Sequence, residues 1–122
     1  MIIGVPKEIK ANEDRVALLP VGVQTLKHHE HTILVETMAG MGSGFDDESY
    51  RRAGAEIVSS PKEIYQRADM VIKVKEPIAS EYPLIRKDQI VFTFFHFAAS
   101  RELTEGMMKA RCVAIAYETV QR

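Results

Sequence analysis

The chain has 122 residues, enough for one domain with a hydrophobic core, and its 46% hydrophobic and 27% charged content is ordinary for a globular protein. Its net charge of -1 gives no basic surface of the kind that binds nucleic acid or anionic lipid, so we expect neither as a partner. There is no run of about 18 apolar residues and no leader-type N-terminus, and the lone Cys112 cannot form an internal disulfide. These features predict a cytoplasmic protein that does not span a membrane.

The first part of the chain alternates strand and helix signals. Ile2–Val5 is a short apolar run typical of a strand, whereas Pro6–Leu18 carries too much charge for a buried element and has no helical periodicity. Pro20 suits the first turn of a helix that ends near His29. Thr32–Glu36 has the composition of a second strand. The order predicted here is therefore strand, charged loop, helix and strand.

The rest of the chain continues this alternation. A helix begins near Asp46, because carboxylates are favoured at the positive N-terminal end of a helix. Ser60 and Glu63 have the spacing of a capping box for a helix that runs to about Ala68. Further strands are predicted over Glu56–Val58, Met70–Val74, Gln89–Phe94 and Val113–Ala116, with a helical turn over Glu81–Ile85 and a helix over Arg101–Ala110. Residues 1–122 are thus expected to form one three-layer α/β domain with a mostly parallel, flavodoxin- or Rossmann-like sheet.

Three side chains form the candidate site. Arg15 lies in the charged loop, Lys75 follows the fourth predicted strand, and His96 comes two residues after Phe94 at the end of the fifth. The carboxyl ends of parallel strands meet at one edge of the sheet, where open α/β sheets bind ligands. Two cations suit a small carboxylate or keto acid, and histidine can transfer a proton near neutral pH. The residues alone leave two other readings open: His96 could be a buried core histidine, and of Lys73 and Lys75 one could point to solvent while the other snorkels over the strand end.

Two further patterns predict no ligand site. The glycines within Gly40–Gly44 resemble a phosphate-binding loop, but the dinucleotide fingerprint needs a third glycine three residues after the second, where Phe45 stands. A turn is the favoured role for this segment. His28, His29 and His31 are interpreted as surface residues near a helix C-terminus, and no metal site is expected.

Five separated motifs carry a resemblance to a known family, the alanine dehydrogenase/pyridine nucleotide transhydrogenase family. The motifs are Gly4–Ala17, Gly40–Gly44, Lys73–Pro77, Phe92–His96 and Ala116–Val120. In their order and spacing they resemble the N-terminal domain of bacterial alanine dehydrogenase, essentially from Met1 to Gln121. The lysine-glutamate-proline and histidine patterns favour the dehydrogenase over the related transhydrogenases.

The resemblance implies an activity and roles for particular residues. The activity is the NAD-dependent oxidative deamination of L-alanine to pyruvate and ammonium, and its reverse. Arg15 and Lys75 would hold the substrate carboxylate and carbonyl, and His96 would act as the general acid and base. Lys75 and His96 would be the catalytic residues. Glutamates in the same motifs would brace these cations; they are Glu8, Glu13, Glu76 and Glu118.

The resemblance also implies what this chain does not carry. In the family, a separate Rossmann domain that follows this segment binds NAD, and the family's chains continue beyond Arg122. Because the sequence has no glycine fingerprint, we expect no cofactor-binding residue in it and no catalysis by it alone. It would be the substrate-binding part of a homo-oligomeric enzyme, as a truncated or a natural fragment. The alternatives are a non-catalytic fragment that serves only in assembly and a transhydrogenase-like subunit with a membrane partner.

Four positions depart from the family's pattern. Leu19 stands where a serine or threonine usually caps a helix, and Glu30 and Cys112 stand where glycine usually ends one. These losses predict a chain less stable than its relatives. Phe94 replaces a tyrosine, which removes a hydroxyl beside His96.

Overall fold

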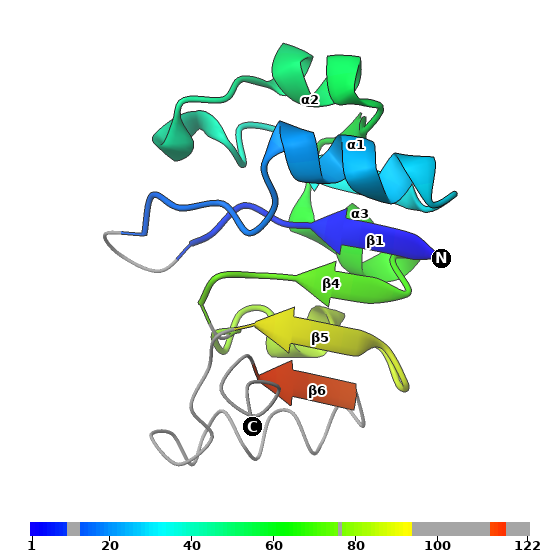
Figure 1. The fold of residues 1–122 in the computed structure, drawn as a ribbon. Helices are drawn as coiled ribbons and strands as arrows, with labels where there is room; N and C mark the ends of the chain where they lie inside the picture. Colours follow the sequence, from blue (N-terminus) through cyan, green and yellow to red (C-terminus); the bar gives the residue numbers. More distant parts are fainter. Residues whose placement is uncertain (10–12, 76, 94–112, 117–122) are drawn as a thin grey trace.

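The computed structural model describes residues 1–9, 13–75, 77–93 and 113–116, and these form an all-parallel sheet of six strands (Figure 1). The strands are β1 Ile2–Val5, β2 Thr32–Glu36, β3 Glu56–Val58, β4 Met70–Ile72, β5 Ile90–Thr93 and β6 Val113–Ala116. Their order across the sheet is β3-β2-β1-β4-β5-β6, the order of Rossmann folds. The predicted parallel α/β fold is confirmed.

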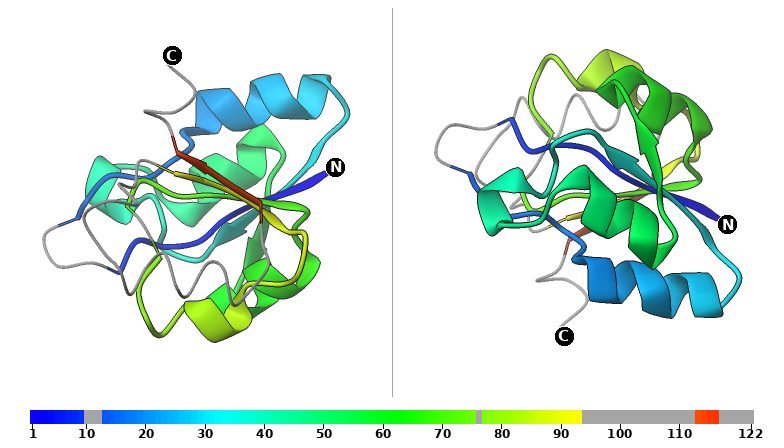
Figure 2. Two further views of the ribbon diagram at one scale, coloured as in Figure 1. Left: turned by 90° about the horizontal axis from the view of Figure 1, so that it is seen from below. Right: turned by 90° about the horizontal axis from the view of Figure 1, so that it is seen from above.

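Helices cover both faces of the sheet, which gives the expected three layers (Figure 2). The helices are α1 Pro20–His28, α2 Asp47–Ala53 and α3 Pro61–Arg67, with short 3-10 helices η1 Met41–Ser43 and η2 Tyr82–Leu84. Residues of α1 and α2 share one hydrophobic cluster with the sheet, and residues of α3 and η2 share the other. None of the described helices has the length and apolar content needed to cross a lipid bilayer.

Strand β2 shows how one apolar run supplies both clusters. Successive side chains of a strand point to opposite faces of the sheet. Ile33 and Val35 therefore pack in the cluster with Val23 of α1, whereas Leu34 packs with Ile64 of α3. All five side chains are fully or almost fully buried. A parallel strand with helices on both faces of its sheet is buried on both sides and therefore needs apolar residues at successive positions. The apolar run of β2 meets this need.

The helix N-termini follow the capping signals of the sequence. The Asp46 side chain accepts a hydrogen bond from the Ser49 N–H at 2.9 Å, and Ser60 Oγ accepts one from the Glu63 N–H at 3.3 Å. Leu19 precedes α1 and makes no side-chain cap, as its apolar side chain predicts. Helix α1 thus begins without the side-chain N-cap hydrogen bond that α2 and α3 have.

The C-terminal end of α1 carries backbone strain that predicts a stabilising substitution. Glu30 has a φ of 69°, in the left-handed region that favours glycine. Glu30→Gly should raise the free energy of unfolding by roughly 0.5–1 kcal/mol, because glycine adopts this conformation without a Cβ clash. A urea midpoint measures the change. Glu30→Ala keeps the strain and serves as the control; equal midpoints for the two variants would contradict the account. Cys112, the other non-glycine position, lies outside the described residues.

One strand boundary differs from the sequence prediction, and one predicted turn is confirmed. Strand β4 ends at Ile72 rather than Val74, because the Val74 N–H donates to the Glu8 side chain at 2.9 Å instead of to a neighbouring strand. The glycine segment Gly40–Gly44 forms the turn that was expected, with η1 inside it and Gly44 at a φ of 86°. The predicted end of the fifth strand at Phe94 and the helix over 101–110 lie outside the described residues.

Candidate functional site

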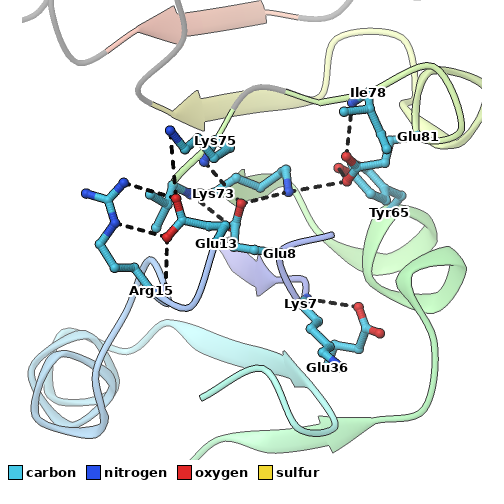
Figure 3. A network of polar contacts seen from close by, with 11 residues as sticks. Lys7, Glu8, Glu13, Arg15, Glu36, Tyr65, Lys73, Lys75, Ile78 and Glu81 are labelled. Atoms are coloured by element: carbon cyan, nitrogen blue, oxygen red, sulfur yellow. Dashed lines mark hydrogen bonds and ion pairs between the residues drawn. The ribbon is translucent and has the colours of Figure 1, made fainter. Parts of the chain in front are cut away.

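Charged side chains gather where strands β1 and β4 end, at the centre of the sheet (Figure 3). The chain leaves β1 toward β2 on one side, while β4 leads to β5 on the other. Such a switch point is where open parallel sheets form their ligand crevice. The loop after β1 supplies Glu8, Glu13 and Arg15, and the segment after β4 supplies Lys73 and Lys75.

Arg15 and Lys75 meet at the carboxylate of Glu13. Arg15 Nε donates to Glu13 Oε2 at 3.0 Å, and Arg15 Nη2 donates to Oε1 at 3.0 Å. Lys75 Nζ forms a longer ion pair with Glu13 Oε1 at 3.9 Å. The Glu13 side chain is only 4% exposed, whereas those of Arg15 and Lys75 are 69% and 43% exposed. A buried carboxylate therefore holds two solvent-facing cations side by side.

One edge of the Arg15 guanidinium stays available for a ligand. Arginine has five N–H donors in a planar fork, and Glu13 uses those on Nε and one on Nη2. Within the described part of the chain, Nη1 makes no ion pair. The Nη1–Nη2 edge can thus receive a second carboxylate in bidentate fashion while Glu13 keeps its place.

The Arg15–Glu13 pair predicts a measurable pH dependence. The hydrogen bond from the Arg15 side chain holds the pKa of Glu13 below the ordinary value of 4.5. Because the folded-state pKa is depressed, the pair stabilises the fold above pH 4.5 and this contribution is lost as the pH falls through the folded-state pKa. Carboxyl carbon NMR should place the Glu13 titration below 4.5, and Arg15→Met should move it upward. The titration of Glu56, whose pKa is lowered by Arg67, should not move; a Glu13 titration unchanged in Arg15→Met would contradict this cause.

A cleft of about 230 Å³ opens beside these side chains. It is lined by Lys7, Glu8, Glu13, Asp14, Arg15, Met38, Ala39, Met41 and Gly42. The size suits a small molecule rather than a dinucleotide, since drug-sized ligands occupy roughly 300–1,000 Å³. Its walls combine the exposed Arg15 with the half-exposed thioethers of Met38 and Met41.

The loop after β2 is fixed against the loop that carries Arg15. Ser43 Oγ donates to the Asp14 carbonyl oxygen at 3.1 Å. A Cβ at Gly42 would lie 2.6 Å from the same oxygen, so only glycine allows this approach. The glycine segment thus closes one side of the cleft.

A buried network lies behind the cleft, and the sequence interpretation did not identify it. Lys73 Nζ is 3.3 Å from Glu8 Oε1 and 3.4 Å from Glu81 Oε2. The Tyr65 hydroxyl donates to Glu81 Oε2 at 2.9 Å, and the Ile78 N–H donates to Glu81 Oε1 at 3.1 Å. Lys73 is 1% exposed, so it neither points to solvent nor snorkels to it over the strand end. A lysine at the end of a buried strand is the one feature of the sequence that could have indicated this network. The sequence did not reveal which residues pair with that lysine.

The structure therefore brings together some of the predicted site residues. Arg15 and Lys75 both contact Glu13, and Glu8 contacts Lys73 and the backbone of Lys75. The remaining predicted residues, His96, Glu76 and Glu118, lie outside the described residues.

The histidines interpreted as surface residues lie away from this edge of the sheet. His28 and His29 are exposed, and His31 Nδ1 lies 3.2 Å from the N-terminal amino group. Over the ranges that the structure describes, no group of three or more histidine, cysteine, aspartate or glutamate side chains could hold a metal ion.

The fold and the charged edge define a class of protein: Rossmann-type parallel α/β domains with paired acidic and basic side chains at the topological switch point. Residues 4–122 match the family model "Alanine dehydrogenase/PNT, N-terminal domain", and the chain belongs to that family.

Individual relatives agree with this assignment. The chain is 55% identical over 120 residues to alanine dehydrogenase of Bacillus subtilis (strain 168), which covers 98% of this chain and 32% of the relative. Among solved structures, an L-alanine dehydrogenase superposes with a TM-score of 0.94 at 54% identity, covering 97% of this chain and 32% of that one. A transhydrogenase from Sinorhizobium meliloti superposes with a TM-score of 0.90 at 30% identity, covering 97% and 35%. The chain thus spans about a third of the length of these relatives.

Proposed function

We propose that this chain is the substrate-binding part of an NAD-dependent alanine dehydrogenase, which converts L-alanine, NAD⁺ and water into pyruvate, ammonium, NADH and a proton. The observation that carries the proposal is the pair of exposed cations, Arg15 and Lys75, held side by side by Glu13 beside a small cleft. The 55% identity to an alanine dehydrogenase over 120 residues supports it. The identity of 54% to a dehydrogenase structure, against 30% to a transhydrogenase, favours this activity over a transhydrogenase subunit.

The site chemistry fits a 2-oxo acid or an amino acid. The free edge of the Arg15 guanidinium would take the substrate carboxylate, and the Lys75 ammonium would lie beside the carboxylate or the carbonyl oxygen. By the resemblance, His96 would transfer the proton at the substrate oxygen or nitrogen. Glu13 would hold both cations in place before the substrate arrives, so that little ordering accompanies binding.

The described residues do not fit NAD itself. A dinucleotide-binding loop needs glycines after β1, but this chain has Pro6 and the buried carboxylate of Glu8 there. A carboxylate at that place would repel a pyrophosphate. NAD would therefore be bound by a different domain, and the isolated chain is expected to be inactive. The enzyme would be a cytoplasmic homo-oligomer.

A chimeric enzyme tests the proposal. This chain would replace the matching N-terminal segment of the Bacillus subtilis alanine dehydrogenase, and NADH oxidation would be followed with pyruvate and ammonium. Turnover that needs both substrates is expected. The intact Bacillus subtilis enzyme is the positive control, and this chain alone is the negative control. An assembled chimera that binds NADH but shows no turnover would overturn the proposal and support a role in assembly only.

A further inference from the structure

Glu8 holds the backbone that carries Lys75. Glu8 Oε2 accepts the Val74 N–H at 2.9 Å, and Glu8 Oε1 accepts the Lys75 N–H at 3.1 Å. These amides lie just past Ile72, where the strand pairing of β4 has ended. One carboxylate thus takes the place of a neighbouring strand for two successive residues. Hydrogen bonds from N–H groups to an ionised carboxylate are stronger than those to a carbonyl.

Lys73 fixes Glu8 in turn. Its ammonium lies 3.3 Å from Glu8 Oε1, which also accepts the Lys75 N–H, and the Glu8 side chain is only 3% exposed. On its other side, Lys73 pairs with Glu81 at 3.4 Å, and Glu81 accepts a hydrogen bond from Tyr65 of α3. The network therefore ties the end of β4 to the loop after β1 and to the helical layer behind the sheet (Figure 3).

We propose that Glu8 is a positioning residue for Lys75, and that Lys73 keeps the Glu8 carboxylate in the orientation this role needs. Glu8 sets where the Lys75 side chain leaves the backbone, while Glu13 sets where its ammonium ends. The proposal concerns the backbone geometry of Lys75, and only its consequence for substrate binding rests on the proposed function.

Glu81 offers a matched control for Glu8. Both are buried glutamates whose carboxylates lie at nearly equal distances from Lys73. Only Glu8 accepts hydrogen bonds from Val74 and Lys75; Glu81 accepts them from Tyr65 and Ile78 instead. Glu8→Gln and Glu81→Gln should therefore lower stability to a similar extent, but only Glu8→Gln should loosen the segment that carries Lys75.

Amide hydrogen exchange of this 122-residue chain, measured by NMR, separates the two effects. In Glu8→Gln, the Val74 and Lys75 amides should exchange at least about fivefold faster than in Glu81→Gln, because glutamine accepts at only one of the two former positions and that acceptor no longer carries a charge. Amides of β2 should change equally in both variants. Equal exchange of Val74 and Lys75 in the two variants would overturn the proposal.

A second variant keeps the test decisive if Glu8→Gln does not fold. Glu8→Asp preserves the charge that faces Lys73 but is one methylene too short to reach both amides. The same local acceleration at Val74 and Lys75 is expected, and normal protection of both amides would again overturn the proposal.

Pyruvate binding then distinguishes this inference from the proposed function. If the unsubstituted chain binds pyruvate, Glu8→Gln should weaken binding about fivefold more than Glu81→Gln. Equal affinities would argue against positioning. If the unsubstituted chain does not bind pyruvate, the proposed function loses the support of a site preformed in this chain, while the exchange rates still decide the role of Glu8.

Discussion

Replacing Lys73 with methionine is expected to lower the free energy of unfolding by about 3–5 kcal/mol, since it leaves two buried carboxylates without their cation. The side chains of Glu8 and Glu81 are 3% and 4% exposed, so water cannot replace the lost ammonium. A loss of this size is a large part of the roughly 5–15 kcal/mol that holds an ordinary domain folded. Urea unfolding followed by circular dichroism measures it.

The neighbouring lysine provides the control. Lys75→Met removes the same kind of side chain, but Lys75 is 43% exposed and its ion pair is 3.9 Å long, so a change within about 0.5 kcal/mol is expected. Combining Lys73→Met with Glu8→Gln and Glu81→Gln should recover part of the lost stability, because the uncompensated charges are then gone. Equal losses of unfolding free energy in Lys73→Met and Lys75→Met would contradict the claim that the buried network around Lys73 stabilises the fold.

Replacing Arg15 with methionine in the chimeric enzyme is expected to lower kcat/KM for pyruvate by roughly 10²- to 10³-fold. Removing one partner of a close charge pair costs about 2–5 kcal/mol, and each 1.4 kcal/mol is tenfold. Arg15→Lys should recover little of this loss, because lysine keeps the charge but has no planar fork for a carboxylate. Steady-state kinetics with pyruvate as the varied substrate give the ratio.

Arg51 on α2 is the matched control for Arg15. It is exposed and pairs with Glu48 at 3.5 Å, away from the cleft. Arg51→Met should leave kcat/KM within about twofold of the unsubstituted chimera, as expected for a surface ion pair that contributes little. A comparable fall of kcat/KM in Arg15→Met and Arg51→Met would contradict a role of Arg15 in binding the substrate.

The fold followed from local signals in the sequence. The apolar runs that became β1 and β2 were predicted with their observed bounds. Short runs rich in β-branched apolar residues are typical of strands in a sheet that is covered on both faces. The end of β4 was predicted two residues too late. Its true end depends on Glu8, whose carboxylate meets the Val74 amide from 66 residues away in the chain. Such a long-range contact leaves no trace in local composition.

The candidate site could be predicted only in outline. Parallel topology places the loop with Arg15 and the segment with Lys75 at one edge of the sheet, and the structure brings both to Glu13. The different environments of Lys73 and Lys75 could not be read from alternation along the strand. They arise because Glu81, positioned by Tyr65 and by the Ile78 amide, meets Lys73 from the far side.

Titration of this chain with pyruvate, followed by NMR, tests the central claim most directly. Because Glu13 already holds Arg15 and Lys75 together, the account predicts saturable shifts of the Arg15 Nε–H and of the Lys75 side chain, and loss of the Lys75 shift in Arg15→Met. Shifts at Lys62, exposed on α3, should be absent. A well-dispersed spectrum in which pyruvate leaves Arg15 and Lys75 unchanged would contradict the claim that this domain carries a preformed carboxylate site.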